Sequence, residues 1–142
     1  MKEKIFTILT NANGEKEYAF IMTDISKFHL INDYWGYETG TKILNFVLRR
    51  MELFSASLFV NRYHSDVFVA VLDITGRKSS DVKKQIEEYN RQIIQEILKT
   101  FQINYFHLNT GIYYLKDISI PAEQIISHTN IVREKAKTEL SG

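Results

Sequence analysis

The sequence predicts an α/β fold of the α+β sandwich type, in which a mainly antiparallel central sheet is flanked by helices. Three observations support this prediction. Short apolar runs of strand length alternate with longer segments of helical periodicity. Two of the strand-like runs are separated only by a short polar stretch, as in a β-hairpin. With 142 residues, 44% of them hydrophobic, the chain fits a single domain with a full core.

The chain opens with a predicted strand and two predicted helices. Residues 18 to 22 form an apolar run that is typical of a strand buried on both faces. Helical spacing follows Asp24 and continues to about Trp35, where Gly36 interrupts it. A second helix is expected from about Thr39, with an apolar face that packs on the sheet.

A hairpin follows these helices. Residues 58 to 60 and 68 to 72 are apolar runs of strand length, and His64 and Ser65 lie in the polar segment that joins them. The turn therefore presents Asp66 at its edge.

The second half of the chain predicts a helix, an extended segment and a final helix. Residues 79 to 81 can cap the first of these helices through their side chains. Residues 105 to 115 alternate loosely, and Gly111 within them indicates a bulge or a close approach of another backbone. Pro121 suits the first turn of the last helix. The apolar positions expected on that helix are Ala122, Ile125, Ile126, Val132 and Ala136.

Composition excludes several classes of function. A net charge of +1 and a pI near 7.9 give no field that would attract nucleic acid. The chain has no cysteine, so disulfides and thiolate metal sites are excluded. Residues 2 to 10 are expected to form a short helix, too short to cross a membrane or serve as a signal core. We therefore expect a cytoplasmic domain that does not itself insert into a membrane.

Two aspartates stand where predicted strands end or turn. Asp24 closes the first strand and Asp66 lies in the hairpin turn, so folding can bring both together. Carboxylate and carbonyl oxygens are the ligands that magnesium prefers beside substrate phosphates. The alternative is that Asp24 caps the following helix and Asp66 stabilises its own turn. The residues alone leave both interpretations open.

The same two segments carry a family resemblance. Residues 24 to 33 read Asp-Ile-Ser-Lys-Phe-His-Leu-Ile-Asn-Asp, and residues 62 to 68 read Arg-Tyr-His-Ser-Asp-Val-Phe. They resemble the Asp-x-Asp-x-Phe-Lys-x-Ile-Asn-Asp and Arg-Tyr-Gly-Gly-Asp-Glu-Phe segments of the GGDEF family, the diguanylate cyclase domains. The similarity runs from about Tyr18 to about Lys137 and implies a nucleotidyl-cyclase or palm-like fold.

The resemblance implies positions for ligands. Asp24, the carbonyl of Ile25 and Asp66 stand at the family's metal positions, with magnesium as the candidate cofactor. The nucleotide positions are Phe28, Asn32 and Thr41 around the guanine base and Lys137 at the phosphates. A core role for Phe28 and a solvated or helix-dipole role for Lys137 are equally open.

The signature is degenerate. It reads His64, Ser65, Asp66, Val67 and Phe68. Val67 replaces the family's glutamate, which helps to deprotonate the attacking hydroxyl, and the first two residues replace paired glycines that leave room for substrate. Thr41 replaces an aspartate that pairs with guanine, and a single hydroxyl cannot reproduce two acceptors. The resemblance therefore implies no complete catalytic set.

These observations predict a catalytically inactive GGDEF-type domain, residues 1 to 142, with a regulatory or protein-interaction role in bacterial cyclic di-GMP signalling. The chain is expected to be a fragment of a longer multidomain protein. Its expected partners are neighbouring domains of that protein, of the sensor or EAL-type phosphodiesterase kind, or a second copy in a homodimer, and not nucleic acid. The alternative is residual GTP binding or diguanylate cyclase activity with magnesium.

Overall fold

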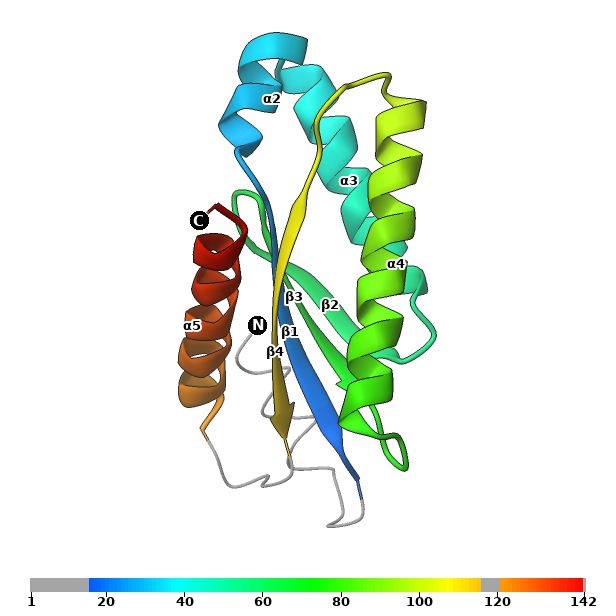
Figure 1. The fold of residues 1–142 in the computed structure, drawn as a ribbon, viewed down its shortest axis with the longest axis vertical. Coiled ribbons are helices and arrows are strands. Elements are labelled where there is room, and N and C mark those ends of the chain that lie inside the picture. Colours follow the sequence, from blue (N-terminus) through cyan, green and yellow to red (C-terminus); the bar gives the residue numbers. More distant parts are fainter. Residues whose placement is uncertain (1–15, 116–120, 142) are drawn as a thin grey trace.

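The computed structural model describes residues 16 to 115 and 121 to 141, without the side chains of residues 122 and 136 to 141. The expected helix at residues 2 to 10 lies outside this part. No helix in the described ranges is both long and apolar enough to span a bilayer. The elements, shown in Figure 1, are β1 (Tyr18–Ile25), α2 (Phe28–Trp35), α3 (Tyr37–Leu53), β2 (Ser57–His64), β3 (Val67–Asp73), α4 (Ser79–Thr100), β4 (Leu108–Leu115) and α5 (Ala122–Ser141).

The four strands form one sheet in the order β2-β3-β1-β4. Each neighbouring pair is antiparallel, which confirms the predicted sheet. β1 lies between β3 and β4 and is buried along its whole length, as its unbroken apolar run predicted. At the end of β1, Asp24 is paired with Val67 of β3 on one side and with Asn109 of β4 on the other.

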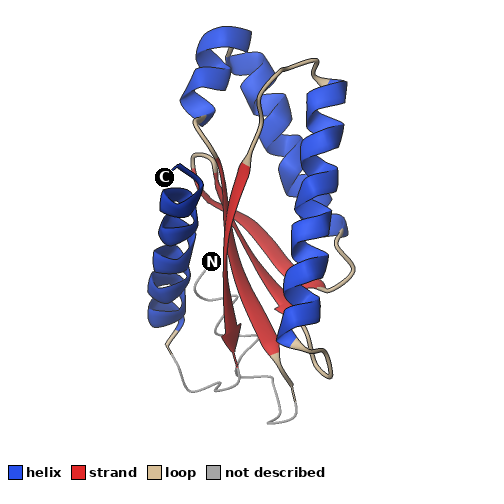
Figure 2. Ribbon diagram, viewed as in Figure 1, coloured by secondary structure: helices blue, strands red, loops and turns tan. Residues whose placement is uncertain are grey.

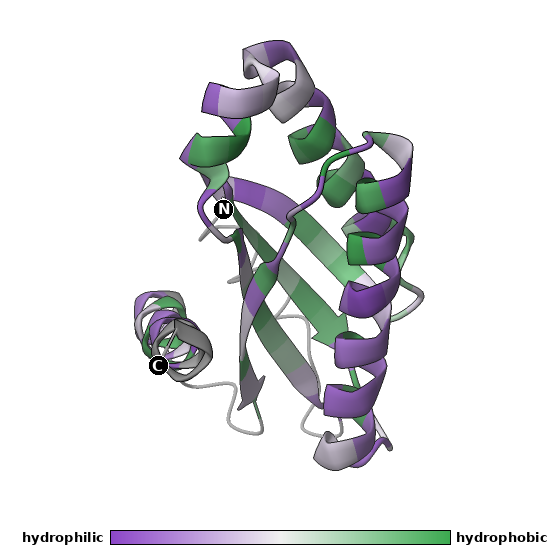
Figure 3. Ribbon diagram, turned by 45° about the horizontal axis from the view of Figure 1, so that its top comes forward, coloured by the Kyte–Doolittle hydropathy of each residue, from purple (hydrophilic) through white to green (hydrophobic). Residues whose placement is uncertain are grey.

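Helices cover both faces of this sheet (Figure 2). Because side chains alternate along a strand, Tyr18, Phe20 and Met22 of β1 face α5 and pack with its Ile125. The intervening Ala19 and Ile21 pack with Val82 and Ile86 of α4, on the face shared with α3. Figure 3 shows the strands largely green between helices that carry much purple. The same alternation directs the side chain of Asp24 toward α5.

Two helix starts differ from the sequence prediction. α3 begins at Tyr37 rather than Thr39, because Gly36 adopts a left-handed φ of 89° and its carbonyl already accepts the N–H of Gly40 at 3.1 Å. α4 lacks the predicted side-chain cap: its N-cap is Lys78, whose extended backbone accepts the N–H groups of Asp81 and Val82 at 3.1 and 3.0 Å.

Gly111 is a point of close backbone approach, as one of the two alternatives predicted, and not a bulge. The register between β1 and β4 is continuous through the pair Met22 and Gly111. A Cβ added at Gly111 would lie 2.6 Å from both the backbone nitrogen of Arg133 and the carbonyl oxygen of Thr129. The missing side chain therefore lets α5 lie directly on β4.

The buried face of α5 is more polar than predicted. Ile125 and Ile126 are buried as expected, but Val132 is 42% exposed. Thr129 and Arg133 are buried instead, because they follow Ile125 at intervals of four residues and so continue its line along the helix. The prediction for Val132 is wrong, because the buried face of α5 includes the polar residues Thr129 and Arg133, which an apolar pattern does not reveal.

Gly111→Ala is expected to destabilise the fold by about 1–3 kcal/mol, because the new Cβ meets helix backbone that cannot rotate away. Gly40→Ala is the matched comparison, since its Cβ would mainly meet the side-chain end of Asn32, which can move. Urea unfolding measures both variants. Wild-type stability of Gly111→Ala, or a larger loss for Gly40→Ala, would contradict the close packing of α5.

Candidate functional site

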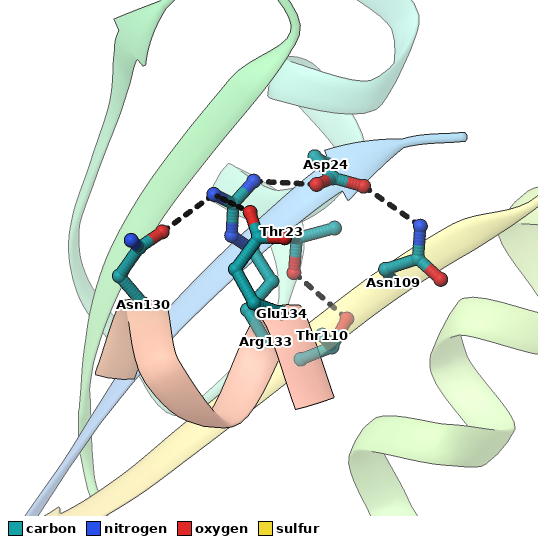
Figure 4. A network of polar contacts seen from close by, with 7 residues as sticks. All are labelled: Thr23, Asp24, Asn109, Thr110, Asn130, Arg133 and Glu134. Carbon is teal, nitrogen blue, oxygen red and sulfur yellow. Dashed lines mark hydrogen bonds and ion pairs between the residues drawn. The ribbon is translucent and has the colours of Figure 1, made fainter. Parts of the chain in front are cut away.

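Asp24 is a buried carboxylate with hydrogen-bond partners on β4 and on α5. It is only 1% exposed. Its Oδ1 accepts the side-chain amide of Asn109 at 2.9 Å, and its Oδ2 forms a hydrogen-bonded ion pair with Nη1 of Arg133. Figure 4 shows the carboxylate between these groups, with Asn109 reaching it from β4 and Arg133 from α5. Both carboxylate oxygens are therefore engaged by the protein.

The local fold explains how these side chains meet. Asp24 and Asn109 are direct partners in the antiparallel register, so their side chains share the face that α5 covers. Arg133 reaches the same place because Gly111 admits the helix backbone. Arg133 is 6% exposed, and its Nη2 donates to Asn130 at 2.5 Å and to Glu134 at 3.1 Å.

The hairpin turn lies beside the end of β1, as predicted. The carbonyl oxygen of Asp66 accepts the N–H of Ile25 at 3.3 Å. Ser65, at the turn, has a left-handed φ of 44°, and Asp66 is half-buried. The alternative in which Asp24 caps α2 is wrong, because the N-cap is Lys27 and no side chain caps that helix.

These residues, as arranged, do not fit a divalent cation at Asp24. An ion bound there would lie next to the guanidinium of Arg133, which already neutralises the carboxylate. Two unit charges about 4 Å apart repel by about 4 kcal/mol at an effective dielectric constant of about 20, and a divalent ion doubles this value. Among the residues that the structure describes, no three or more His, Cys, Asp or Glu side chains are grouped to hold a metal.

The residues predicted to contact nucleotide lie partly together. Asn32 and Phe28 of α2 both approach Gly40 of α3, where an added Cβ would lie 3.2 Å from the Phe28 ring. Phe28 also packs against the core beneath α3 and α4, in agreement with its alternative role. Thr41 follows Gly40 and is exposed. Lys137 belongs to α5, but its side chain lies outside the described residues, so its nucleotide role stays a prediction.

Comparison with known proteins decides the family. The family model described as "Diguanylate cyclase, GGDEF domain" matches residues 1–141. The chain belongs to the GGDEF family. This confirms the resemblance carried by residues 24 to 33 and 62 to 68.

Individual relatives agree with this assignment. Diguanylate cyclase DgcN of Escherichia coli K12 is 28% identical over 127 residues, which are 89% of this chain and 29% of DgcN. The chain thus spans less than a third of that relative. The coiled coil and GGDEF domain of DgcB from Caulobacter crescentus, solved with c-di-GMP, has a TM-score of 0.79 at 15% identity, covering 96% of this chain and 73% of that one.

A third relative is bound to another protein. Diguanylate cyclase SiaD of Pseudomonas aeruginosa, solved in complex with its activator SiaC, has a TM-score of 0.73 at 18% identity, covering 97% of this chain and 52% of SiaD. At such low identities the solved structures show the fold alone. They confirm that the antiparallel sheet and its flanking helices are those of a GGDEF domain.

The signature of this GGDEF domain is divided between surface and core. His64 and Ser65 are exposed, whereas Val67 is 4% exposed and Phe68 is fully buried. Val67 lies directly opposite Asp24 in the register, so both side chains are on the face covered by α5. An apolar side chain thus occupies the signature position that is paired with Asp24 across the two strands.

Sequence reasoning missed Asn109 and Arg133. The signal for Asn109 is its place two residues before Gly111, which puts both residues on the same face of β4. The signal for Arg133 was its spacing from Ile125 and Thr129, which places all three on one line of α5. Neither signal identifies Asp24 as the partner, because Arg133 and Asp24 are 109 positions apart in the chain.

Asp24→Asn is expected to destabilise the domain by about 3–5 kcal/mol, because the guanidinium of Arg133 loses its buried counter-ion and keeps only the more exposed Glu134. Asp66→Asn is the matched control and should change stability by only about 0.5 kcal/mol, since Asp66 is a half-buried turn residue. Urea unfolding with a metal chelator present makes the comparison. Equal, small effects of the two substitutions would show that the ion pair does not support the fold.

Proposed function

We propose that this GGDEF domain is catalytically silent and acts as a regulatory or protein-interaction domain in cyclic di-GMP signalling. The observation that carries the proposal is the buried ion pair of Asp24 with Arg133, with Val67 beside it. Asp24 stands at a position that family resemblance assigns to metal, and here a protein cation neutralises it.

The position of Val67 adds a second obstacle to the cyclase reaction. Resemblance assigns this position to a glutamate that helps to deprotonate the attacking ribose hydroxyl. Valine cannot accept a proton, and the loss of a positioned base typically slows a reaction by a factor of about 10² to 10⁴. The side chain is also buried in the core with Met22 and Val69, so no substrate hydroxyl can reach it without rearrangement of the sheet face.

The relatives support a role that involves other protein segments. The DgcB structure includes a coiled coil, and SiaD is bound to an activator protein. This chain spans 29% of DgcN. We therefore propose that it works in the cytoplasm, together with neighbouring domains of its polypeptide, of the sensor or EAL-type phosphodiesterase kind, or with a second copy of itself.

The direct test is conversion of GTP to cyclic di-GMP with Mg²⁺ or Mn²⁺. We expect no product from this chain, or from a longer polypeptide that contains it, under conditions in which an active diguanylate cyclase gives robust turnover. Asp66→Asn is the control for contaminating activity, because contaminating turnover survives that substitution. Turnover that is robust in the wild type and lost in Asp66→Asn would overturn the proposal.

A further inference from the structure

We infer that Arg133 is an internal cation that takes the place of a divalent metal ion at Asp24, so that metal is excluded from this position by the packing of α5. The inference rests on the proposed function in that it concerns the same site. It goes further by assigning the cause of metal exclusion to one residue outside the signature segments. It is also testable without any measurement of catalysis.

The charges and contacts favour a permanent arrangement. Asp24 and Arg133 are 1% and 6% exposed, so both are removed from solvent. A guanidinium keeps its positive charge at all pH values at which proteins fold, so the carboxylate of Asp24 has a permanent cation as its partner. The neutral amide of Asn109 also donates a hydrogen bond to Asp24, at 2.9 Å. The carboxylate has its charge balanced without any bound ion.

The helix backbone keeps Arg133 in place. Thr129, one turn earlier in α5, is fully buried, and its hydroxyl donates to the carbonyl of Ile125 at 2.6 Å. The backbone of residues 129 and 133 rests on Gly111, where even a Cβ would be only 2.6 Å away. Arg133 can therefore leave Asp24 only if its side chain is extruded past packed neighbours or if α5 separates from the sheet. A dissolved metal ion would have to drive one of these changes.

The neighbours of Arg133 show why the guanidinium is held from more than one side. Nη1 faces Asp24, while Nη2 donates to Asn130 and to Glu134 on the same helix (Figure 4). Two of these three partners belong to α5 itself, so the side chain is oriented by its own helix before it meets β1. This arrangement makes Arg133 a positioning residue for Asp24 and for the docking of α5.

The test is to remove the internal cation and offer Mn²⁺, an ion that binds carboxylate and carbonyl oxygens like those at this position. The variants are Arg133→Met and Arg133→Gln, the second of which keeps a donor for Asp24 without its charge. Calorimetry and the Mn²⁺-dependent shift of the thermal midpoint are measured for both and for the wild type. We expect either variant to bind Mn²⁺ at least ~10-fold more tightly than the wild type, because the repulsion is removed.

The matched control is the double variant Asp24→Asn, Arg133→Met, which replaces the ion pair by two neutral side chains and should gain no Mn²⁺ affinity. A single variant that folds only when Mn²⁺ is present supports the inference. Equal Mn²⁺ binding by the wild type and both single variants overturns it, as does a gain in the double variant. The inference is also overturned if Mn²⁺ fails to bind to either single variant and also fails to restore the folding of either one.

The outcomes separate this inference from the proposed function. Cyclic di-GMP synthesis by the wild type contradicts catalytic silence. Mn²⁺ binding by the wild type that is lost in the double variant Asp24→Asn, Arg133→Met, without any product, overturns only the internal-cation inference. A metal-free wild type with metal-binding Arg133 variants supports the inference, even when those variants also make no product.

Discussion

The buried ion pair between Asp24 and Arg133 is the constraint on which the arrangement of this domain depends. It joins β1, an inner strand of the sheet, to the last helix, and each partner is costly to bury without the other. Gly111 is the geometric condition for the pair, because only a residue without a side chain lets α5 come close enough. The ion pair and the apolar packing of α5 on the sheet therefore depend on each other.

Val67 and Arg133 have complementary effects on the charge around Asp24. Val67 lies opposite Asp24 on the face covered by α5, so a glutamate in its place would put a second carboxylate beside the pair. Arg133 already pairs with both Asp24 and Glu134, so a second buried negative charge beside Asp24 would add repulsion there. The apolar residue in the signature adds no charge beside Asp24, and the basic residue in the last helix supplies a cation for it, so the two features are compatible.

Much of the fold could be predicted from the sequence, because apolar residues repeat at different intervals in strands and in helices, and these intervals can be recognised over short segments. The hairpin and the end of the first strand were expected to meet, and the hydrogen bond from Ile25 to Asp66 joins them. The ion pair could not be predicted, because a basic residue late in a helix is usually exposed, and its burial depends on contacts with β1 and β4. The predicted side-chain cap of α4 was also wrong. The backbone carbonyl of Lys78, rather than a serine hydroxyl, accepts the first N–H groups of that helix.

An internal counter-ion also changes how the proposed regulatory role could operate. A carboxylate site that binds a metal ion reversibly is either empty or occupied. The local charge differs between these two states, and the surrounding residues can respond to that difference. At Asp24 the cation is always present, because Arg133 is covalently part of the helix that covers it. Under the proposed function, signals must then act on the outside of the domain. Large side chains are available there, among them Tyr34 and Tyr37, which are 76% and 77% exposed where α2 meets α3.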